Sequence, residues 1–230
     1  MSYTLFIGNK NTDAWSMGPW VLMKQAGIAF NEQPVRSDAA ESIELKKALR
    51  AVTPLGKLPV LVDPSLGSNP SIWDSLAMCE YLAEVHPDLN LWPAERTARA
   101  RARSLCAEMH AGFQELRAMC PMNIEARLPA IGERLIHKNN AFCDDLNRLV
   151  NMWQTQLKLS GGPMLFGQFT IADAYFVSMC MRIRTYALPV SPPVQAYISR
   201  VVALPSVGEW IAKAEQDADF FIHEAPCLQA

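Results

Sequence analysis

The sequence predicts an α/β domain followed by an all-α domain, and three observations support this division. Within residues 1–85, short runs of aromatic and β-branched residues alternate with segments of helical periodicity. After Ala94, apolar residues recur only at helical spacing. The stretch "HPDLNLWPAE" between these blocks carries two prolines and no hydrophobic period, which is typical of a linker. We therefore expect domains at residues 1–85 and 95–230, joined by a linker at residues 86–94.

The first block begins with a predicted strand, helix and second strand. The strand "YTLFIG" ends at Gly8, and the helix Trp20–Ala26 ends before Gly27. The next strand, residues 29–36, carries Pro34, which places it near a sheet edge. Such a β-α-β unit favours a parallel pair of strands.

Three more segments complete the first block. Residues 37–52 predict a polar helix. Residues 58–62 predict a strand with Pro59 at its start, where a residue without an N–H is tolerated. The segment "SIWDSLAMCEYLAEVHP" predicts the end of a strand and then a helix that stops before Pro87.

The second block predicts long helices. Residues 95–119 read as one helix, and residues 140–160 as another that the following "GGP" stops. Arg96, Arg99 and Arg103 share one face of the first helix; this stripe is either a solvated face or the border of an anionic ligand or partner subunit. In "LFGQFTIADAYF", Thr170 and Asp173 form a capping pair.

Composition excludes several classes of function. The net charge of -2 gives no reason to expect a nucleic-acid or membrane partner. The six cysteines form no C-x-x-C pair, so we expect no metal and interpret them as buried, reduced side chains of a cytoplasmic protein. The sequence lacks a secretory signal pattern and an apolar run of the ~18–20 residues that span a bilayer.

The loop before the first helix carries short polar side chains at Thr12, Asp13 and Ser16. The first N–H groups of a helix attract anions, so this loop is either a helix cap or the holder of a reactive anion. Further along, "GKLPVLVD" contains a residue, Leu58, that Pro59 forces into an extended conformation. With a cis bond at Pro59, the backbone of Leu58 can pair with a peptide-like ligand; an ordinary edge proline is the alternative.

A third polar pair, Asp74 and Ser75, stands at the start of a predicted helix directly after a strand. It is either a plain N-cap or a cap that also binds a ligand. In the second case Ser75 and nearby N–H groups hold a carboxylate and Asp74 holds an ammonium group, as in an amino acid.

In this order and spacing, the three motifs resemble the glutathione transferase superfamily over nearly the whole chain. The segments "ARARARSLCAEMHAGFQELRAMCPMNI", "GGPMLFGQFTIADA" and "MRIRTYALPVSPPVQAYI" are most similar to a bacterial branch with a serine-type active site. The resemblance implies a thioredoxin-like N-terminal domain, an all-α C-terminal domain, glutathione as co-substrate and a homodimer.

The resemblance also implies roles for individual residues. Leu58, before Pro59, would bind the cysteinyl backbone of glutathione. Asp74 and Ser75 would hold its γ-glutamyl group, and Lys57 would reach its glycyl carboxylate.

The opening loop departs from the serine branch, which reads S-S-W-S-x-R-P-W where this chain has "DAWSMGPW". Asp13 takes the place of the catalytic serine, Ala14 that of the second serine and Gly18 that of an arginine. An ionised carboxylate cannot donate a hydrogen bond to a thiolate and disfavours one nearby. Either Asp13 is a cap that points away, or Thr12 or Ser16 supplies the hydroxyl, or the protein is a weak transferase; we favour Thr12 as the replacement donor.

The function that follows from the resemblance is conjugation of the glutathione thiolate to small apolar electrophiles, as in detoxification. Candidate pocket residues are apolar side chains, which are more often core: Trp15, Met17, Phe113, Leu116, Cys120 and Met122. The alternatives are a glutathione-dependent isomerase or peroxidase, and a non-catalytic glutathione-binding protein.

Overall fold

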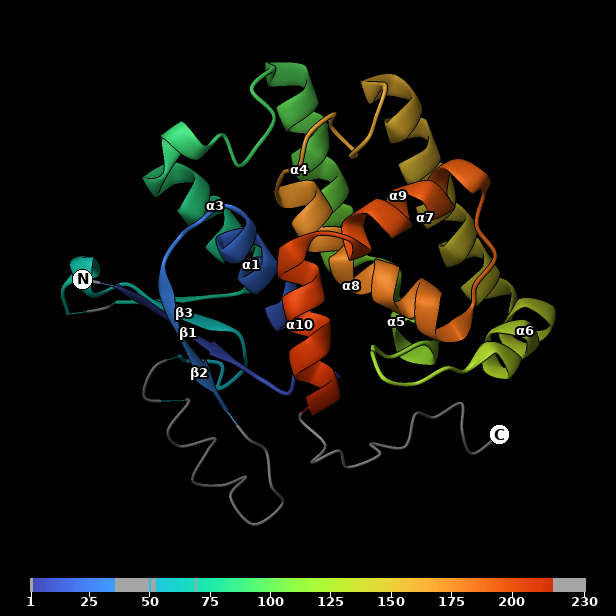
Figure 1. Ribbon diagram of the computed structural model, residues 1–230, viewed down its shortest axis with the longest axis horizontal. Coiled ribbons are helices and arrows are strands. Elements are labelled where there is room, and N and C mark those ends of the chain that lie inside the picture. Colours follow the sequence, from blue (N-terminus) through green and yellow to red (C-terminus); the bar gives the residue numbers. More distant parts are fainter. Residues whose placement is uncertain (1, 36–49, 51–52, 69, 217–230) are drawn as a thin grey trace, which may run out of the picture.

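The structure, a computed structural model, describes residues 2–35, 50, 53–68 and 70–216 (Figure 1). Its first part contains strands β1 (Tyr3–Ile7), β2 (Phe30–Pro34), β3 (Val60–Val62) and β4 (Ser71–Trp73), with helices α1 (Ala14–Gln25) and α3 (Ser75–Val85) and the short 3₁₀ helix η1 (Pro64–Leu66). The predicted helix at 37–52 lies, apart from Arg50, outside the described residues.

The four strands form one sheet in the order β2-β1-β3-β4. β1 pairs with β2 in parallel, as the β-α-β pattern predicts, and β2 with its Pro34 lies at the edge. β3 runs antiparallel to both β1 and β4. Val60 is opposite Phe6 on one side and Trp73 on the other. The end of β1, the start of β3 and the end of β4 therefore lie side by side at the same end of the sheet.

The second part is helical. It contains α4 (Arg96–Ala111), α5 (Gln114–Met119), α6 (Pro129–Lys138), α7 (Asn140–Ser160), α8 (Ile171–Tyr186), α9 (Pro192–Val202) and α10 (Pro205–Gln216). A 3₁₀ helix, η2 (Pro87–Leu89), lies in the predicted linker. The predicted α/β domain followed by an all-α domain is confirmed, and the first domain has the thioredoxin-like arrangement.

The prediction of a single helix over residues 95–119 is wrong. The helix ends at Ala111 because Gly112 is extended and Phe113 adopts a left-handed backbone with φ 52°. A Cβ on Gly112 would lie 2.8 Å from the carbonyl oxygen of Glu108. The Arg117 guanidinium donates to the carbonyl oxygens of Met109, His110 and Gly112, which satisfies acceptors at the end of α4.

Helix α1 also differs from its prediction, because it begins at Ala14 rather than Trp20. The apolar pattern starts only at Trp20, but Asp13 caps the helix earlier in the chain. Pro19 lies inside α1, where its missing N–H removes one helical hydrogen bond.

Helix α8 is buried on nearly every side and packs along α1, which brings the two domains together (Figure 1). At Gly18 the helices approach closely, because a Cβ there would lie 3.3 Å from the carbonyl oxygen of Ala174. The capping box of Thr170 and Asp173 is confirmed at the start of α8. Leu91 and Trp92 of the predicted linker are buried, so one apolar core runs through both domains.

Candidate functional site

At the start of α1, the Asp13 carboxylate is a helix cap. Its Oδ1 accepts hydrogen bonds from the backbone N–H groups of Trp15 and Ser16, each at 3.2 Å. Its Oδ2 accepts from the Gly8 N–H at 2.8 Å and from the Ser16 hydroxyl. The cap interpretation of Asp13 is thus confirmed, and N–H groups that would attract a thiolate already have a negative partner.

The two candidate hydroxyl donors of this loop differ in accessibility. Ser16 is completely buried and its proton is donated to Asp13, which argues against Ser16 as a donor to a ligand. Thr12 is exposed, and its hydroxyl has no partner within the described part of the chain. The role of Thr12 as donor stays a prediction.

The segment before β3 offers a backbone edge. The Leu58–Pro59 peptide bond is cis, as predicted. Leu58 is half-buried, and its N–H has no acceptor among the residues that the structure describes. Lys57 next to it is exposed.

Asp74 caps α3 from an unusual backbone conformation. Its Oδ1 accepts from the N–H groups of Leu76 at 2.9 Å and Ala77 at 3.1 Å, which confirms the N-cap. Its backbone has φ 76° and ψ 125°, outside the regions that non-glycine residues normally adopt. Conformations of this kind cost free energy and concentrate at functional sites.

Two side chains from the helical domain lie beside Asp74 and Ser75, and neither was predicted from the sequence as a site residue. His110 of α4 places its Nε2 3.3 Å from Asp74 Oδ2 and its Nδ1 2.6 Å from the hydroxyl of Tyr175 on α8. The Tyr175 hydroxyl lies 3.2 Å from Ser75 Oγ. Burial raises the pKa of Tyr175 well above its ordinary value, so the phenol stays neutral.

Trp15 lies against this group. Its ring centroid is 5.4 Å from that of His110 and 6.5 Å from that of Tyr175, and the Arg117 guanidinium stacks 4.9 Å from it. Of the predicted pocket residues, Trp15 is therefore the one that the structure brings beside Asp74 and Ser75.

The other predicted pocket residues belong to the core instead. Exposed fractions are 4% or less for Met17, Phe113, Leu116, Cys120 and Met122. α5 packs on α7, where Asp145 accepts from the N–H groups of Glu115 and Leu116, and this contact turns Leu116 inward. These side chains do not face solvent, so in this structure they line no open pocket.

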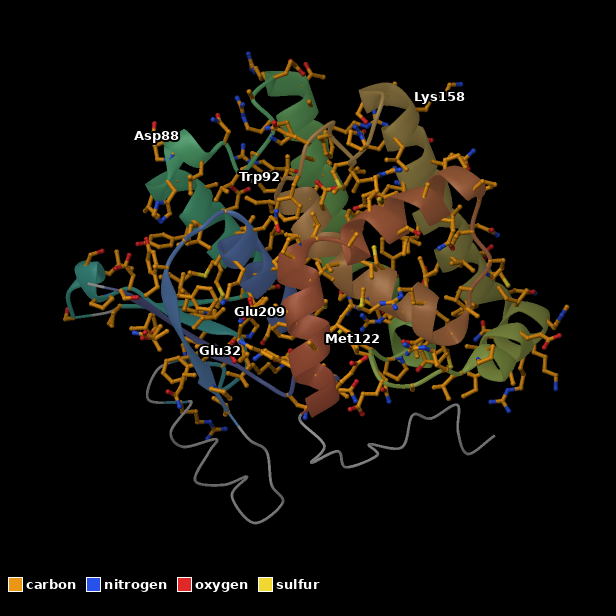
Figure 2. All side chains as sticks on the ribbon, viewed as in Figure 1. Glu32, Asp88, Trp92, Met122, Lys158 and Glu209 are labelled. Atoms are coloured by element: carbon orange, nitrogen blue, oxygen red, sulfur yellow. The ribbon has the colours of Figure 1, made fainter. Side chains whose placement is uncertain are left out.

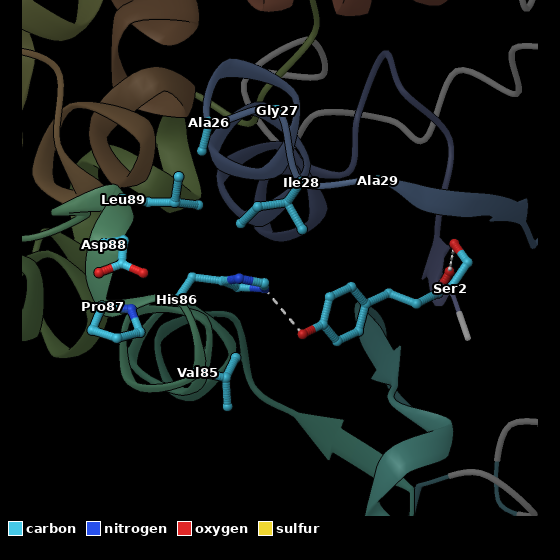
Figure 3. A pocket seen from close by; sticks show the side chains of 11 residues that line it. Ser2, Ala26, Gly27, Ile28, Ala29, Val85, His86, Pro87, Asp88 and Leu89 are labelled. Carbon is cyan, nitrogen blue, oxygen red and sulfur yellow. Dashed lines mark hydrogen bonds between the residues drawn. The ribbon is translucent and has the colours of Figure 1, made fainter.

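Two surface hollows lie elsewhere. One, of about 690 Å³, is lined by Tyr3, Ile28 and His86, and the Tyr3 hydroxyl is 3.0 Å from His86 Nε2 (Figure 3). The other, of about 420 Å³, lies between α3 and α4 and includes Trp92, whose position Figure 2 marks. Neither of these two hollows is lined by Thr12, Leu58 or Asp74.

Whether cysteine thiols or metal ligands among the described residues could take part in chemistry depends on their arrangement and burial. No group of three or more histidine, cysteine or acidic side chains there is arranged to hold a metal ion. Cys79, Cys106 and Cys180 are free and buried, and burial raises the pKa of each thiol, which makes them poor nucleophiles. No described helix is both long and apolar enough to span a bilayer.

Comparison with known proteins agrees with the fold. Residues 14–85 match the family described as the glutathione S-transferase N-terminal domain. A probable maleylacetoacetate isomerase of Caenorhabditis elegans is 37% identical over 75 residues, which are 33% of this chain and 33% of that protein. The chain thus matches about a third of the length of that curated relative.

Solved structures match over most of the chain. A Burkholderia glutathione transferase homologue with bound glutathione has a TM-score of 0.70 at 25% identity, covering 94% of this chain and all (100%) of that one. A bacterial zeta-class maleylpyruvate isomerase has a TM-score of 0.68 at 19% identity and covers 93% of this chain and 99% of its own. The chain therefore has the glutathione transferase fold, and its residues 14–85 match the N-terminal domain of the glutathione S-transferase superfamily.

Proposed function

We propose that this protein binds glutathione at the end of the sheet where β1 and β4 end and β3 begins, and that it activates the thiol of glutathione. The observation that carries the proposal is the register at Val60, which is opposite both Phe6 and Trp73. This register brings together the loop after β1, the backbone of Leu58 and the start of α3. These are the three segments that the resemblance assigns to the tripeptide.

Each segment offers a complementary group. The extended Leu58 backbone pairs with the cysteinyl residue as an added strand. Ser75 at the start of α3 donates to the γ-glutamyl carboxylate, and Asp74 binds the ammonium group. The exposed Thr12 hydroxyl donates to the thiolate, and Lys57 reaches toward the glycyl carboxylate.

Glutathione titration of wild-type protein and Asp74→Asn in a calorimeter tests the site. Asparagine preserves the cap but removes the charge, so we expect affinity to fall about tenfold, the change for one lost hydrogen bond to a charged group. Asp88→Asn, which changes an exposed carboxylate on η2, is the matched control and should bind as wild type. Failure of wild-type protein to bind glutathione would refute the proposal.

The reaction is a conjugation or an isomerisation, and the relatives give the second a specific basis. The Caenorhabditis elegans relative is a probable maleylacetoacetate isomerase, and a matched structure is a maleylpyruvate isomerase. Both reactions use the same thiolate. Parallel assays on an aromatic halide and on a cis-configured maleyl compound separate the two, and binding without turnover on either would indicate a non-catalytic glutathione-binding protein.

Within the superfamily we place the chain nearest the serine-type branch, as a cytoplasmic homodimer. The arginine stripe bears on the dimer: Arg103 forms a two-point ion pair with Glu80 at 2.9 and 3.0 Å, while Arg99 donates to the carbonyl oxygens of Pro93 and Ala94. These bonds order α4 against α3 as one surface, which a symmetric partner would use twice. Sedimentation of a monomer at micromolar concentration would contradict the dimer.

A further inference from the structure

A chain of polar contacts begins and ends on two adjacent residues of the proposed glutathione site. It runs from Asp74 to His110, from His110 to Tyr175, and from Tyr175 to Ser75, at 3.3, 2.6 and 3.2 Å. Tyr175 and Ser75 are each only 3% exposed, so water hardly competes for their hydroxyl groups. The direction of each hydrogen bond in this series therefore depends on the direction of its neighbours.

When His110 is neutral, its partners decide where its proton lies. A carboxylate faces Nε2, so the proton is placed there and Nδ1 is an acceptor. The Tyr175 hydroxyl then donates to Nδ1, and the Ser75 hydroxyl donates to Tyr175. In this state the Ser75 proton is directed into the protein.

Protonation of His110 reverses the chain. Nδ1 becomes a donor and can no longer accept from Tyr175. The Tyr175 hydroxyl accepts from His110 and donates to Ser75 instead. The Ser75 proton is released to donate to the carboxylate of a ligand.

Protonation also strengthens the attraction between His110 and Asp74. This attraction opposes binding of the glutathione ammonium group to Asp74. The Asp74 and His110 side chains are 40% and 37% exposed, and exposed ion pairs contribute little. A hydrogen bond from the buried Ser75 to a carboxylate is worth more. Ammonium binding has to compete only with this weak Asp74–His110 contact, so the gain at Ser75 is larger than the cost at Asp74.

We propose that His110 is a positioning residue that sets, through Tyr175, whether Ser75 donates to the γ-glutamyl carboxylate. The inference rests on the proposed glutathione site. Among the residues that the structure describes, the charged groups that contact His110 are Asp74 from the start of α3 and Arg117 from α5, whose guanidinium donates to the His110 carbonyl oxygen. Trp15 of α1 and Tyr175 of α8 face it as neutral rings.

Titration with S-methylglutathione tests the proposal, because this analogue has no thiol to ionise. We expect wild-type protein to bind it about tenfold more tightly at about pH 5.5 than at about pH 8. Tyr175→Phe interrupts the chain and leaves Ser75 free at both pH values. It should bind equally at both, with the affinity that wild-type protein has in acid.

Two further variants complete the test. Ser75→Ala should bind weakly at both pH values, while His137→Gln, an exposed histidine on α6, should keep the wild-type pH dependence. A flat wild-type profile, a pH-dependent Tyr175→Phe, or a Tyr175→Phe that binds weakly throughout would each overturn the positioning role. Binding that is absent at every pH would instead refute the glutathione site itself.

Discussion

Asp13 shows how one residue changes the chemistry of a helix start. Its carboxylate accepts from the N–H groups of Trp15, Ser16 and Gly8. Even the neighbouring glycine is constrained by it, because a Cβ on Gly8 would lie 2.6 Å from Asp13 Oδ2. A thiolate bound nearby would meet a negative charge and few free donors, which leaves the exposed Thr12 hydroxyl as the accessible one.

Thr12→Ala should therefore slow turnover. Loss of a hydrogen bond to a charged group corresponds to about 1.5–3 kcal/mol, or roughly ten- to a hundredfold in rate. The thiol pKa of bound glutathione should rise at the same time, which a rate-against-pH profile measures. Thr12→Ser keeps the hydroxyl and serves as control; equal rates in all three proteins would exclude Thr12 as the donor.

Asp13→Ser makes the complementary change. Serine is also a preferred N-cap, so α1 should form, while the negative charge is removed. We expect a lower thiol pKa and a higher rate at neutral pH in the same assay. An unchanged pH profile would show that the carboxylate lies too far from the sulfur to affect it.

At the scale of elements, close helix packing depends on single glycines. Gly132 of α6 lies so near the end of α8 that a Cβ would be 2.0 Å from the carbonyl oxygen of Tyr186. Gly208 of α10 has nothing within 4 Å of the same position. The two residues are helical glycines with opposite surroundings.

Alanine at these positions should have opposite effects on the free energy of unfolding. Gly132→Ala forces α6 away from α8 and should destabilise the protein by about 1–3 kcal/mol or more. Gly208→Ala gains helix propensity and should stabilise it by about 0.5–1 kcal/mol. Urea denaturation of both variants measures the difference, and equal effects would contradict the close approach.

The cap of α8 makes a pH-dependent contribution. Asp173 is completely buried, and burial raises its pKa to about 6, although Leu165, Thr170 and Tyr197 donate to it. Because its folded-state pKa lies above the unfolded value near 3.9, its stabilisation is full below about pH 4 and is lost as the pH rises to about 6. The difference in unfolding free energy between wild type and Asp173→Asn should thus shrink by about 3 kcal/mol over this range; a constant difference would contradict it.

At the scale of the whole molecule, α10 returns to the first domain through a charged cluster. Lys10 is 3% exposed and pairs with Glu32 of β2, which also accepts from Trp20 Nε1 at 2.7 Å. The indole of Trp210 on α10 donates to the Lys10 carbonyl oxygen at 2.8 Å. Lys213 of α10 lies 4.0 Å from Glu32 and 2.8 Å from Glu209, two residues that Figure 2 labels, so this cluster joins α10 to the first domain.

Glu32→Gln should weaken this junction in a pH-dependent way. Burial alone would raise the pKa of Glu32. Hydrogen bonds from Lys10 and Trp20 have the larger combined effect, so the pKa lies below its ordinary value. With a depressed folded-state pKa, the stabilisation is present above about pH 4.3 and is lost as the pH falls through the folded pKa. Urea denaturation should show a loss of about 1–3 kcal/mol at neutral pH that vanishes in acid; a loss that persists in acid would contradict this.

Features that arise from neighbouring residues could be predicted from the sequence. Strand and helix periodicity and the caps at Asp13, Asp74 and Thr170 depend on local sequence, and these caps are present. A left-handed break such as Phe113 escaped prediction, because helical periodicity continues across it.

Contacts between distant residues, in contrast, depend on how the helices and strands pack together. Tyr175 contacts Ser75 across 100 positions of the chain and His110 across 65, and no local pattern distinguishes Tyr175 or His110 from ordinary helical residues. Likewise, apolar residues such as Met17, Leu116 and Cys120 suit a pocket wall and a core alike, and they are buried in a structure where α1 packs on α8 and α5 on α7. Periodicity records which face of a helix avoids water, whereas the partner of that face is set by how all the helices pack together.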